Sequence, residues 1–450
     1  MFDVAVIGAG VVGCAVARRF ALGGARVVLL EKGADLLSGA SKGNSAILHT
    51  GFDAPPGSLE HACMQAGYRE YLAIRERLGL PLLESGAMVL AWDEAQAETL
   101  PGIIETAHGN GVEDVRLLSR AEILAREPEL SPAVQAGVLV PGECLIDPWS
   151  APLAYALQAI AAGAEIRRNI EVLGGAFSGG RWGLRTSEGT LEAAAIVNCA
   201  GLFGDRLEAA LLGEAAFTIK PRKGQFVVFD KPAARLLRHI ILPVPTERTK
   251  GIVVTPTIFG NVLVGPTAQE QESRTDASTD HATLEMLKAK GEEILPGLAR
   301  VDVTAIYAGI RPATAQKQYC VRHEADRNYI GLSGIRSTGL TAALGLALHA
   351  WALHGGGAEQ SAPAVTGVPR LAECAPRDWQ LPGHGGIICH CEAVTRREIE
   401  AALQGPLPAG DFGGLRRRTR AGMGRCQGFY CNASLASLSA GKFKEPLAHE

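Results

Sequence analysis

Two sets of residues in this sequence have types and spacings that could do chemistry, and the first lies at its start. Three glycines with a G-x-G-x-x-G spacing follow the apolar run 3–7 and open the apolar segment 14–22. Glycines in this context allow a tight turn, a close approach of backbone to a pyrophosphate, and close packing of a helix on a strand. A second apolar run ends at Glu31, whose carboxylate can accept hydrogen bonds from a ribose. We therefore predict a bound dinucleotide rather than an ordinary glycine-rich turn, and the glycines concerned are Gly8, Gly10 and Gly13.

The second set is formed by four of the ten cysteines, which lie near the end of the sequence. A single residue separates Cys389 from Cys391, and four residues separate Cys426 from Cys431. Four thiolates in two close pairs can hold either zinc or an iron–sulfur cluster. Zinc knuckles usually place two or more residues between paired cysteines, so the first pair argues against them. The other cysteines are scattered, and we expect them to be small buried apolar residues.

The elements that must position these residues alternate along the chain. At 450 residues the sequence exceeds one typical core, so more than one domain is expected. Strand and helix patterns of a nucleotide-binding domain occur in 1–80, 150–215 and 326–355, interrupted by a strand-rich substrate domain in 81–149 and 216–325. A Gly/Pro/Ala-rich linker, 356–385, precedes a C-terminal unit, 386–450. We predict an α/β fold with the cofactor where the two larger domains meet.

Charge and hydropathy narrow the setting of the protein. The formal charge of −3 gives no global reason to expect nucleic acid or an anionic membrane surface. No run approaches the roughly eighteen apolar residues that a membrane-spanning helix needs. The first predicted strand begins at residue 2, which leaves no room for a signal peptide ahead of it. We therefore expect a cytoplasmic protein without a membrane span of its own.

In the order of its motifs, the sequence resembles flavin-dependent oxidoreductases of the D-amino-acid-oxidase and glycerol-3-phosphate-dehydrogenase superfamily, including L-2-hydroxyglutarate dehydrogenases. Each motif alone is loose, whereas their order along residues 1 to 355 is specific. The matching residues beyond the glycines and Glu31 are Asn44, Ser45, His49 and Gly51, then 198–201, Gly309, Ile310, Arg311 and Pro312, and finally Gly334, Ile335, Ser337, Gly339, Leu340 and Thr341.

This resemblance implies a Rossmann-like FAD-binding domain interleaved with a mixed-sheet substrate domain. Glu31 and Lys32 would lie at the adenosine ribose, and a helix beginning at Gly339 would face the flavin with its N-terminus, which favours negative charge on the reduced ring. The full set of expected FAD contacts is Gly8, Gly10, Gly13, Glu31, Lys32, Ser41, Asn44, Ser45, Ala200, Gly201, Gly309, Gly334, Gly339, Leu340 and Thr341.

The resemblance also implies the positions of two catalytic side chains, because relatives place a histidine and an arginine on the substrate side of the flavin. Neutral His49 could remove a hydroxyl proton, or it could be a loop histidine that only bonds the cofactor. Arg311 could fork onto a carboxylate or phosphate, or it could be an ion pair between domains. Among other cations, Lys223 and Lys250 are candidate substrate ligands, although loop cations are more often simply solvated.

The tail resembles the bacterioferritin-associated-ferredoxin-like domain, a small helical [2Fe-2S] module that also ends the anaerobic glycerol-3-phosphate dehydrogenase large subunit. The match includes Cys389-His390-Cys391 and 415–428, and it implies Cys389, Cys391, Cys426 and Cys431 as ligands. The arginines at 416, 417, 418 and 420 would otherwise suggest a nucleic-acid patch. Beside an anionic cluster we expect them to compensate charge or to dock an acidic redox partner.

Together these observations predict an FAD-dependent dehydrogenase whose electrons leave through a [2Fe-2S] cluster to a partner subunit or acceptor protein. The expected substrate is a small anionic secondary alcohol, with glycerol 3-phosphate first and L-2-hydroxyglutarate or another 2-hydroxy acid second. An opine or amino-acid dehydrogenase subunit and a non-catalytic electron-transfer subunit remain as alternatives. We expect no nucleic acid, and any membrane association would be peripheral, through a partner.

Overall fold

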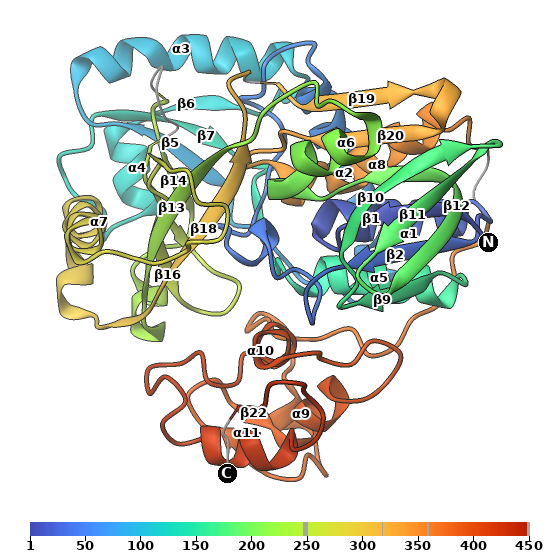
Figure 1. The fold of residues 1–450 in the computed structure, drawn as a ribbon. Helices are drawn as coiled ribbons and strands as arrows, with labels where there is room; N and C mark the ends of the chain where they lie inside the picture. Colours follow the sequence, from blue (N-terminus) through green and yellow to red (C-terminus); the bar gives the residue numbers. More distant parts are fainter. Residues whose placement is uncertain (246–250, 317, 358–359, 448–450) are drawn as a thin grey trace.

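The protein, described here from a computed structural model of residues 1–245, 251–316, 318–357 and 360–447, consists of three units. Two large units, each built around a β-sheet, lie side by side, and a small C-terminal unit lies beneath both of them (Figure 1). Within the described residues, no helix is both long and apolar enough to cross a lipid bilayer.

The first sheet has eight strands within the described residues, in the order β10-β11-β12-β1-β2-β9, with β20 on β12 and β19 on β20. Its core strands β9, β2, β1, β12 and β20 pair in parallel. The strands are β1 (Phe2–Ile7), β2 (Val27–Glu31), β9 (Glu165–Arg168), β10 (Val172–Ser178), β11 (Arg181–Thr186), β12 (Gly189–Asn198), β19 (Cys320–Glu324) and β20 (Tyr329–Ser333). Two of them differ from expectation: β10 was not foreseen, and β19 was assigned to the substrate domain.

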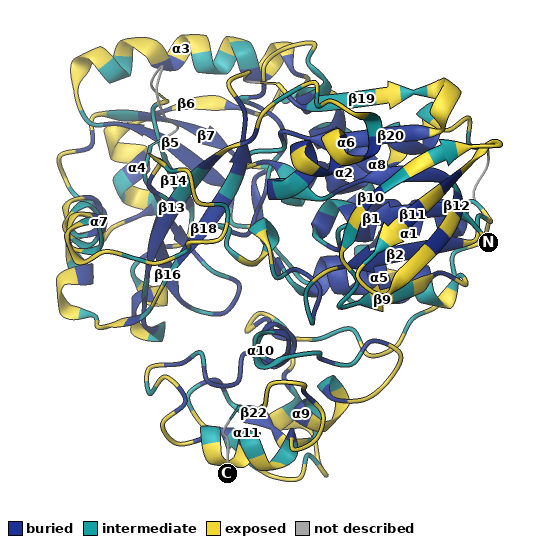
Figure 2. Ribbon diagram, viewed as in Figure 1, coloured by how far each residue is buried: buried dark blue, intermediate teal, exposed yellow. Residues whose placement is uncertain are grey.

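Helices cover both faces of this sheet, as continuous apolar strands require. Helices α1, α5 and α8 consist largely of buried residues, which Figure 2 draws in dark blue. Helices α2 and α8 approach closely, because a Cβ on Gly67 would lie 2.0 Å from the Thr341 carbonyl oxygen. The helices of this unit are α1 (Val11–Leu22), α2 (Leu59–Leu78), α5 (Ser150–Ala161), α6 (Gly204–Leu212) and α8 (Gly339–Leu353).

The second sheet has nine strands within the described residues and is mixed, mostly antiparallel. Its longest pair joins β13 and β18 and places Arg222 opposite Arg311. The strands are β5 (Ala87–Ala91), β6 (Arg116–Ser119), β7 (Ala136–Val140), β13 (Lys220–Phe229), β14 (Ile240–Pro243), β15 (Val253–Pro256), β16 (Val262–Gly265), β17 (Gln269–Glu270) and β18 (Val303–Ala313). The accompanying helices are α3 (Glu94–Gly109), α4 (Arg120–Arg126) and α7 (His281–Ile294).

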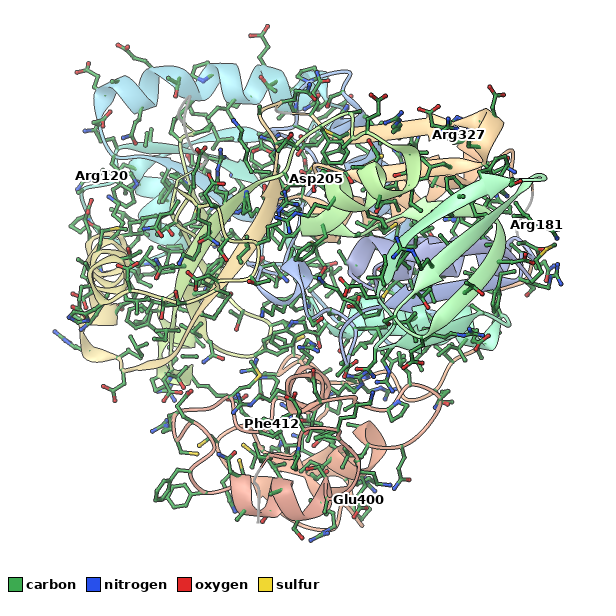
Figure 3. The ribbon with its side chains drawn as sticks, in the orientation of Figure 1. Arg120, Arg181, Asp205, Arg327, Glu400 and Phe412 are labelled. Atoms are coloured by element: carbon green, nitrogen blue, oxygen red, sulfur yellow. The ribbon has the colours of Figure 1, made fainter. Side chains whose placement is uncertain are left out.

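Two contacts hold the large units together. A small antiparallel sheet joins β3 (Ile47–Leu48), β8 (Cys144–Ile146) and β4 (Leu82–Leu83), which come from three distant parts of the chain. On the other side, Asp205 of α6 accepts hydrogen bonds from Arg274 Nη1 and Nη2, at 2.5 and 2.9 Å. Asp205 lies where the two large units meet (Figure 3). The cofactor loop 38–49 is thus held between two sheets.

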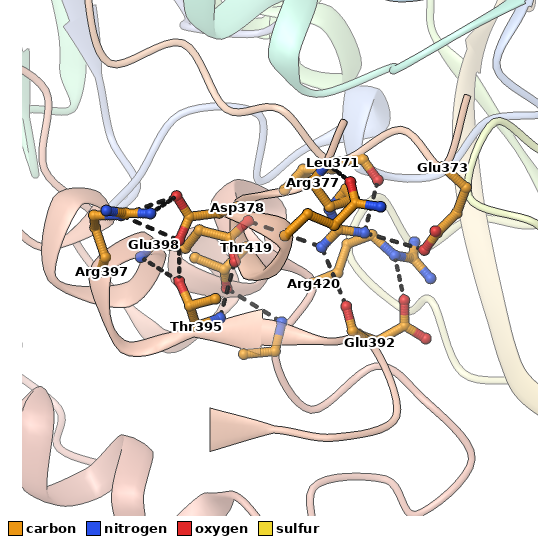
Figure 4. A network of polar contacts seen from close by, with 12 residues as sticks. Leu371, Glu373, Arg377, Asp378, Glu392, Thr395, Arg397, Glu398, Thr419 and Arg420 are labelled. Atoms are coloured by element: carbon orange, nitrogen blue, oxygen red, sulfur yellow. Dashed lines mark hydrogen bonds and ion pairs between the residues drawn. The ribbon is translucent and has the colours of Figure 1, made fainter. Parts of the chain in front are cut away.

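The C-terminal unit is small and built from short elements around its own buried core. Within the described residues, these elements are β21 (Ile387–Cys389), β22 (Val394–Thr395), α9 (Arg396–Ala402), α10 (Phe412–Thr419) and α11 (Asn432–Leu438). The preceding segment, predicted as a linker, has little regular structure but is not loose. Arg377 is only 2% exposed and bonds Glu373 and the Glu392 carbonyl, so the segment is tied to the C-terminal unit (Figure 4).

Asp35, just after β2, anchors the C-terminal unit on the first unit. Its buried carboxylate accepts hydrogen bonds from Arg418 Nη1 and Nη2, at 2.6 and 3.0 Å, and from the Gly410 N–H at 3.0 Å. A Cβ on Gly410 would lie 1.8 Å from the Ala34 carbonyl oxygen, so the two backbones touch. The C-terminal unit therefore docks on the nucleotide side of its own chain.

Replacing Arg418 by Gln should destabilise this docking strongly, because Asp35 would stay buried without its counter-charge. Breaking a buried ion pair from one side typically costs about 3–5 kcal/mol. We expect faster backbone hydrogen exchange over 410–419 and a lower unfolding temperature of the C-terminal unit. Arg116→Gln, which removes a half-exposed pair with Glu122, is the matched control and should cost about 1 kcal/mol or less. Equal protection of 410–419 in both variants would contradict the anchoring role.

Candidate functional site

The carboxyl ends of the parallel strands bring the predicted nucleotide residues to one edge of the first sheet. Gly8 follows β1, Lys32 follows β2, 199–201 follow β12, and Gly334 follows β20. Because these strands are parallel, their carboxyl ends meet at the same edge, which is where such sheets bind ligands. Residues scattered over more than three hundred positions are thereby gathered.

The glycine turn leaves no room for larger side chains. A Cβ on Gly8 would lie 2.6 Å from the Cys199 carbonyl oxygen, and Gly8 has a φ of +100°. A Cβ on Gly13 would lie 1.8 Å from the Gly8 carbonyl oxygen, so α1 packs directly on the turn. Gly10 sits beside the Ser41 hydroxyl, which accepts a hydrogen bond from Val11 N at 3.0 Å. This arrangement fits a backbone cradle for a pyrophosphate.

Glu31 and Lys32, the two residues expected at the adenosine ribose, lie at the carboxyl end of β2 beside the glycine turn. Glu31 accepts hydrogen bonds from the N–H groups of Ala9 and Gly33, each at 2.8 Å, which fixes its carboxylate beside the glycine turn. The Lys32 ammonium lies 3.4 Å from the centre of the Phe203 ring, close to Ala200 and Gly201. The residues at the carboxyl ends of β2 and β12 therefore form one wall of the candidate nucleotide site.

Two helices begin at this site without a side-chain cap from the residue that precedes them. Helix α1 starts after Gly10 and α8 after Thr338, and neither has an acidic residue in its first turn. Uncapped N–H groups and the helix dipole favour a negatively charged ligand. Such ends suit a pyrophosphate at α1 and an electron-rich ring at α8, whose first residues are Gly339, Leu340 and Thr341.

His49 is held by a carboxylate that the sequence alone did not reveal. Its Nδ1 lies 2.7 Å from Glu143 Oε2, and its backbone N–H donates to Thr341 Oγ1 at 3.0 Å. Glu143 is fully buried and also accepts hydrogen bonds from Thr50 N and Oγ1, at 2.6 and 2.9 Å. With Nδ1 held in this way, proton exchange with a substrate falls to Nε2. The one available signal for Glu143 was a lone acid between the apolar runs 136–140 and 144–146.

Asn44 and Ser45 lie in the loop that leads to His49. The Asn44 side chain turns back on the loop, bonding the Ser41 carbonyl oxygen at 3.1 Å and the Ala46 N–H at 2.8 Å. Ser45 is half-buried beside it. The Asn44 side chain thus shapes the loop, whereas its carbonyl oxygen accepts a hydrogen bond from Tyr307 of β18 at 2.8 Å.

Strand β18 carries Arg311 on the face that meets this loop. Side chains alternate along a strand, so Tyr307, Gly309 and Arg311 share one face. Tyr307 bonds Asn44, and a Cβ on Gly309 would lie 2.7 Å from the Gly43 carbonyl oxygen. Gly309 is therefore needed for close backbone contact with the loop. Arg311 lies two residues further along the same face of β18, which belongs to the second sheet.

Within the described residues, no carboxylate forms an ion pair with Arg311. Its Nη2 donates to the Thr267 carbonyl oxygen at 2.9 Å, and its nearest charged neighbour on the facing strand is Arg222. Burial, with the like charge of Arg222 second, lowers the pKa of Arg311 to about 10. A half-buried cation without a counter-charge is stabilised by an anionic ligand. The ion pair between domains that the sequence left open is thus not formed by the described residues.

Lys223 does not join Arg311 in the described structure. Lys223 is the cross-strand partner of Ile310, so it points to the opposite face of β13 from Arg222. Its ammonium lies 3.6 Å from Asp276 Oδ2. Lys250 lies outside the described residues. The cation that the fold does bring beside Arg311 is Arg222, which pairs with Glu270 at 3.0 Å.

The four C-terminal cysteines meet in two pairs. The thiols of Cys391 and Cys426 lie within hydrogen-bonding range of each other, as do those of Cys389 and Cys431. A [2Fe-2S] cluster needs two thiolates on each iron, and these pairs provide such a donor set. Over the described part of the chain, no three His, Cys, Asp or Glu side chains gather around one ion position, as a structural zinc site would require.

The loop between Cys426 and Cys431 is shaped for anionic sulfur. Backbone N–H groups, that of Tyr430 most strongly, lower the pKa of Cys426, whereas burial raises the pKa of Cys431 to about 12. A Cβ on Gly424 would lie 2.3 Å from Cys391 Cβ, so the loop closes tightly on the first pair. A bound metal centre would keep a buried thiol such as Cys431 ionised, because a coordinating thiol loses its proton.

Three of the four arginines at 416, 417, 418 and 420 are turned inward, which corrects the expectation that they could dock an acidic redox partner. Arg417, Arg418 and Arg420 are 8%, 6% and 7% exposed. Arg418 pairs with Asp35, and Arg420 Nε donates to Glu392 Oε2 at 2.8 Å. Buried side chains cannot meet a partner. Burial lowers the pKa of Arg416, and the nearby Cys431 thiolate opposes this shift, so Arg416 is placed for the expected charge compensation.

Comparison with known proteins adds to this geometry. Residues 3–353 match the family of FAD dependent oxidoreductases, and residues 387–438 match the BFD-like [2Fe-2S] binding domain. The sequence is 30% identical to a glycerol 3-phosphate dehydrogenase of Caloramator mitchellensis, over 98% of this chain and 94% of that protein. It is also 30% identical to an L-2-hydroxyglutarate dehydrogenase of Escherichia coli O17:K52:H18 (strain UMN026 / ExPEC), over 65% of this chain and 70% of that protein.

The fold has a counterpart among solved structures. It superimposes with a TM-score of 0.75 on the dithionite-reduced L-alpha-glycerophosphate oxidase of Mycoplasma pneumoniae with FAD bound, with 28% sequence identity over 81% of this chain and 97% of the other. The strand edge, the glycine cradle and the paired cysteines fit the two groups that these families hold. This chain therefore belongs to the family of FAD dependent oxidoreductases and carries a BFD-like [2Fe-2S] binding domain at its C-terminal end.

Proposed function

We propose that this enzyme is a dehydrogenase that oxidises glycerol 3-phosphate to dihydroxyacetone phosphate and passes the electrons out through its [2Fe-2S] cluster. The observation that carries the proposal is the convergence of His49, held by Glu143, with Arg311 on the strand that packs against the cofactor loop. A general base, together with a cation that has no carboxylate partner among the described residues and lies on a strand touching the same loop, suits a secondary alcohol with an anionic group.

His49 is proposed to remove the hydroxyl proton of the substrate at Nε2. Glu143 holds Nδ1–H, which fixes the orientation of the ring and stabilises the charge that the ring gains with the proton. Thr50 keeps the Glu143 carboxylate in place by donating two hydrogen bonds. FAD, when bound, accepts the hydride from the carbon that carried this hydroxyl.

Arg311 is proposed to hold the anionic group of the substrate. Its guanidinium can bind phosphate or carboxylate through two parallel hydrogen bonds, which would orient the reacting carbon. Arg222, directly opposite on β13, can add a second positive charge. Two adjacent arginines can meet both charges of one phosphate group, whereas the two carboxylates of L-2-hydroxyglutarate lie at opposite ends of that molecule, and this difference favours glycerol 3-phosphate.

The C-terminal cluster supports a dehydrogenase rather than an oxidase. An oxidase delivers electrons to oxygen at the flavin and needs no further redox group. The similarity to the glycerol 3-phosphate dehydrogenase extends over 98% of the chain and so includes the cluster domain, whereas the match to the glycerophosphate oxidase covers 81%. We propose a one-electron acceptor protein as the external partner.

L-2-hydroxyglutarate is the second candidate, and the same two side chains could serve it. The match to an L-2-hydroxyglutarate dehydrogenase covers 65% of this chain. Arg311 would then hold a carboxylate, and His49 would act unchanged. The two substrates differ in the chemistry of their anionic group, so a direct comparison separates them.

The substrate assignment predicts that glycerol 3-phosphate bleaches the flavin absorption of the purified enzyme when oxygen is excluded. L-2-hydroxyglutarate should reduce the flavin more slowly, because the paired arginines suit a phosphate. The measurement is flavin absorbance after anaerobic mixing with each compound and with an amino acid as a further control. Faster bleaching by L-2-hydroxyglutarate would replace glycerol 3-phosphate by the second candidate, and no bleaching by any compound would favour a non-catalytic subunit.

Replacing His49 by Ala should slow flavin reduction by about 10²–10⁴-fold, the usual contribution of a general base. Glu143→Gln should cause a smaller loss and shift the pH dependence, because the ring loses the carboxylate that stabilises its protonated form. His61→Gln is the matched control, since His61 Nε2 lies 3.2 Å from the Asn110 carbonyl oxygen and His61 has no role in the proposed mechanism. Rapid-mixing absorbance measures all three variants, and full flavin reduction in His49→Ala would remove this residue from the mechanism.

Replacing Arg311 by Met should raise the KM for the anionic substrate by about 10²-fold, because a buried charged contact is lost. Arg311→Lys should recover only part of the affinity, since an ammonium cannot form the two-pronged contact. Lys223→Met tests the other cation proposed from the sequence. It lies on the opposite strand face, so we expect an unchanged KM. Steady-state kinetics with an artificial electron acceptor measures the KM of each variant. A KM raised in Lys223→Met but unchanged in Arg311→Met would assign the anion site to Lys223.

A further inference from the structure

The C-terminal unit touches the rest of the chain close to its cysteines. Arg425, next to Cys426, pairs with Asp230 at 2.7 Å, and the Gln427 side chain donates to the Thr304 carbonyl oxygen. Lys231 lies 3.8 Å from Glu392, next to Cys391. The pair of Cys391 and Cys426 is therefore placed beside the second sheet of its own chain.

Two stacked aromatic rings lead from this contact to the cofactor loop. Trp149 and Phe259 stack with ring centres 5.6 Å apart and an angle of 15° between their planes. Trp149 Nε1 donates to the Lys42 carbonyl oxygen at 3.4 Å, in the loop between Ser41 and Asn44. Phe259 is only 5% exposed and packs with Leu371 and Ala372 of the segment that enters the C-terminal unit.

Arg420 continues the contact from Phe259 to the cysteines. Its guanidinium lies 4.1 Å from the centre of the Phe259 ring, and its Nε donates to Glu392 Oε2 at 2.8 Å. Glu392 is 2% exposed and directly follows Cys391 (Figure 4). Lys42, Trp149, Phe259, Arg420 and Glu392 thus form one unbroken series of packed side chains and hydrogen bonds.

We propose that electrons pass from the flavin to the [2Fe-2S] cluster within one chain, across the contact formed by Trp149, Phe259 and Arg420. This inference rests on the proposed function, in which the cluster is the exit for electrons. It identifies these residues as positioning residues that close the gap between the two cofactor sites. A packed series favours transfer because electronic coupling falls more steeply across empty or water-filled space than through bonded and contacting atoms.

The electron count is consistent with this route. Oxidation of the alcohol releases two electrons and two protons, one proton to His49 and the other with the electrons as hydride to FAD. A [2Fe-2S] cluster takes one electron at a time, so two successive transfers cross the contact. After the first transfer and before the second, the electron would pass from the cluster to a one-electron acceptor protein. The flavin proton would leave to solvent.

The position of the C-terminal unit favours transfer within the chain over transfer to a neighbouring copy. Asp35 and Arg418 hold α10 against the loop that follows β2, and Arg168 Nη1 donates to the Pro408 carbonyl oxygen at 2.7 Å. On the other side, Asp230 and Thr304 hold the cysteine loop. The C-terminal unit is thus fixed on both large units, and the stacked rings of Trp149 and Phe259 lie between these two attachments.

The test follows flavin and cluster separately in the full-length enzyme containing both cofactors. After anaerobic mixing with glycerol 3-phosphate, stopped-flow absorbance records flavin reduction, and rapid-freeze EPR records cluster reduction. In Phe259→Leu and Trp149→Leu we expect unchanged flavin reduction but cluster reduction slowed by about tenfold, as for other residues of a coupling network. Trp149→Phe, which keeps a ring, should recover most of the rate. The wild-type rate of cluster reduction should not change on dilution of the protein.

Phe412→Leu is the matched control, because Phe412 also lies beneath an arginine of α10, with Arg416 4.4 Å from its ring centre (Figure 3). It lies off the proposed route, so cluster reduction should keep the wild-type rate. Iron and sulfide content and the EPR signal of the dithionite-reduced cluster show whether each variant retains its cluster.

Unchanged cluster reduction in Phe259→Leu and Trp149→Leu, or equal slowing in Phe412→Leu, would overturn the route. A rate that falls on dilution would assign the transfer to a neighbouring copy. Failure of the proposed function has a different signature, because the wild-type flavin would then not be bleached, or it would be bleached while the cluster stayed oxidised.

Discussion

The buried carboxylate of Asp35 is the interaction on which the arrangement of the whole molecule depends. A buried charge is stable only if it is paired and fully hydrogen-bonded, and Asp35 receives its partners from a helix nearly four hundred residues away. The same short segment carries Glu31, which borders the glycine turn. One loop therefore faces the nucleotide site on one side and holds the cluster-binding unit on the other. This shared loop explains how a flavin and a cluster can belong to one electron path.

The proposed catalytic side chains depend on a second kind of constraint, namely close backbone contact. Gly43 and Gly309 touch, and Tyr307 bonds the Asn44 carbonyl oxygen, so the cofactor loop and β18 cannot separate. This contact brings Arg311 of the second sheet to the loop that carries His49. Arg311 then lacks a carboxylate partner among the described residues, whereas His49 has Glu143. The two proposed roles have opposite electrostatic needs. A base is helped by a neighbouring carboxylate, whereas a cation that binds an anionic substrate should not already be paired with one.

The C-terminal unit uses its arginines in a way that their clustering in the sequence conceals. A run of basic residues usually indicates a solvated face or an anion-binding patch. Here Arg418 and Arg420 form buried ion pairs with Asp35 and Glu392, respectively. Consequently the external acceptor must recognise some other surface of the unit. The buried pairs also explain why the segment 360–386, rich in glycine and proline, does not act as a flexible tether.

Local patterns in the sequence determined the strand–turn–helix at the start, most helices, the expected cofactors and the four cysteines, because each depends on residues close together or on spacing within one motif. Strand pairing escaped them: β10 and the position of β19 depend on partners elsewhere in the sheet. Only tertiary structure decided that Glu143 meets His49, that Lys223 and Arg311 lie on opposite faces, and that Asp35 meets Arg418. The two contacts join residues that are 94 and 383 positions apart in the sequence. Such pairings are set by the packing of whole sheets and domains, which no short stretch of sequence encodes.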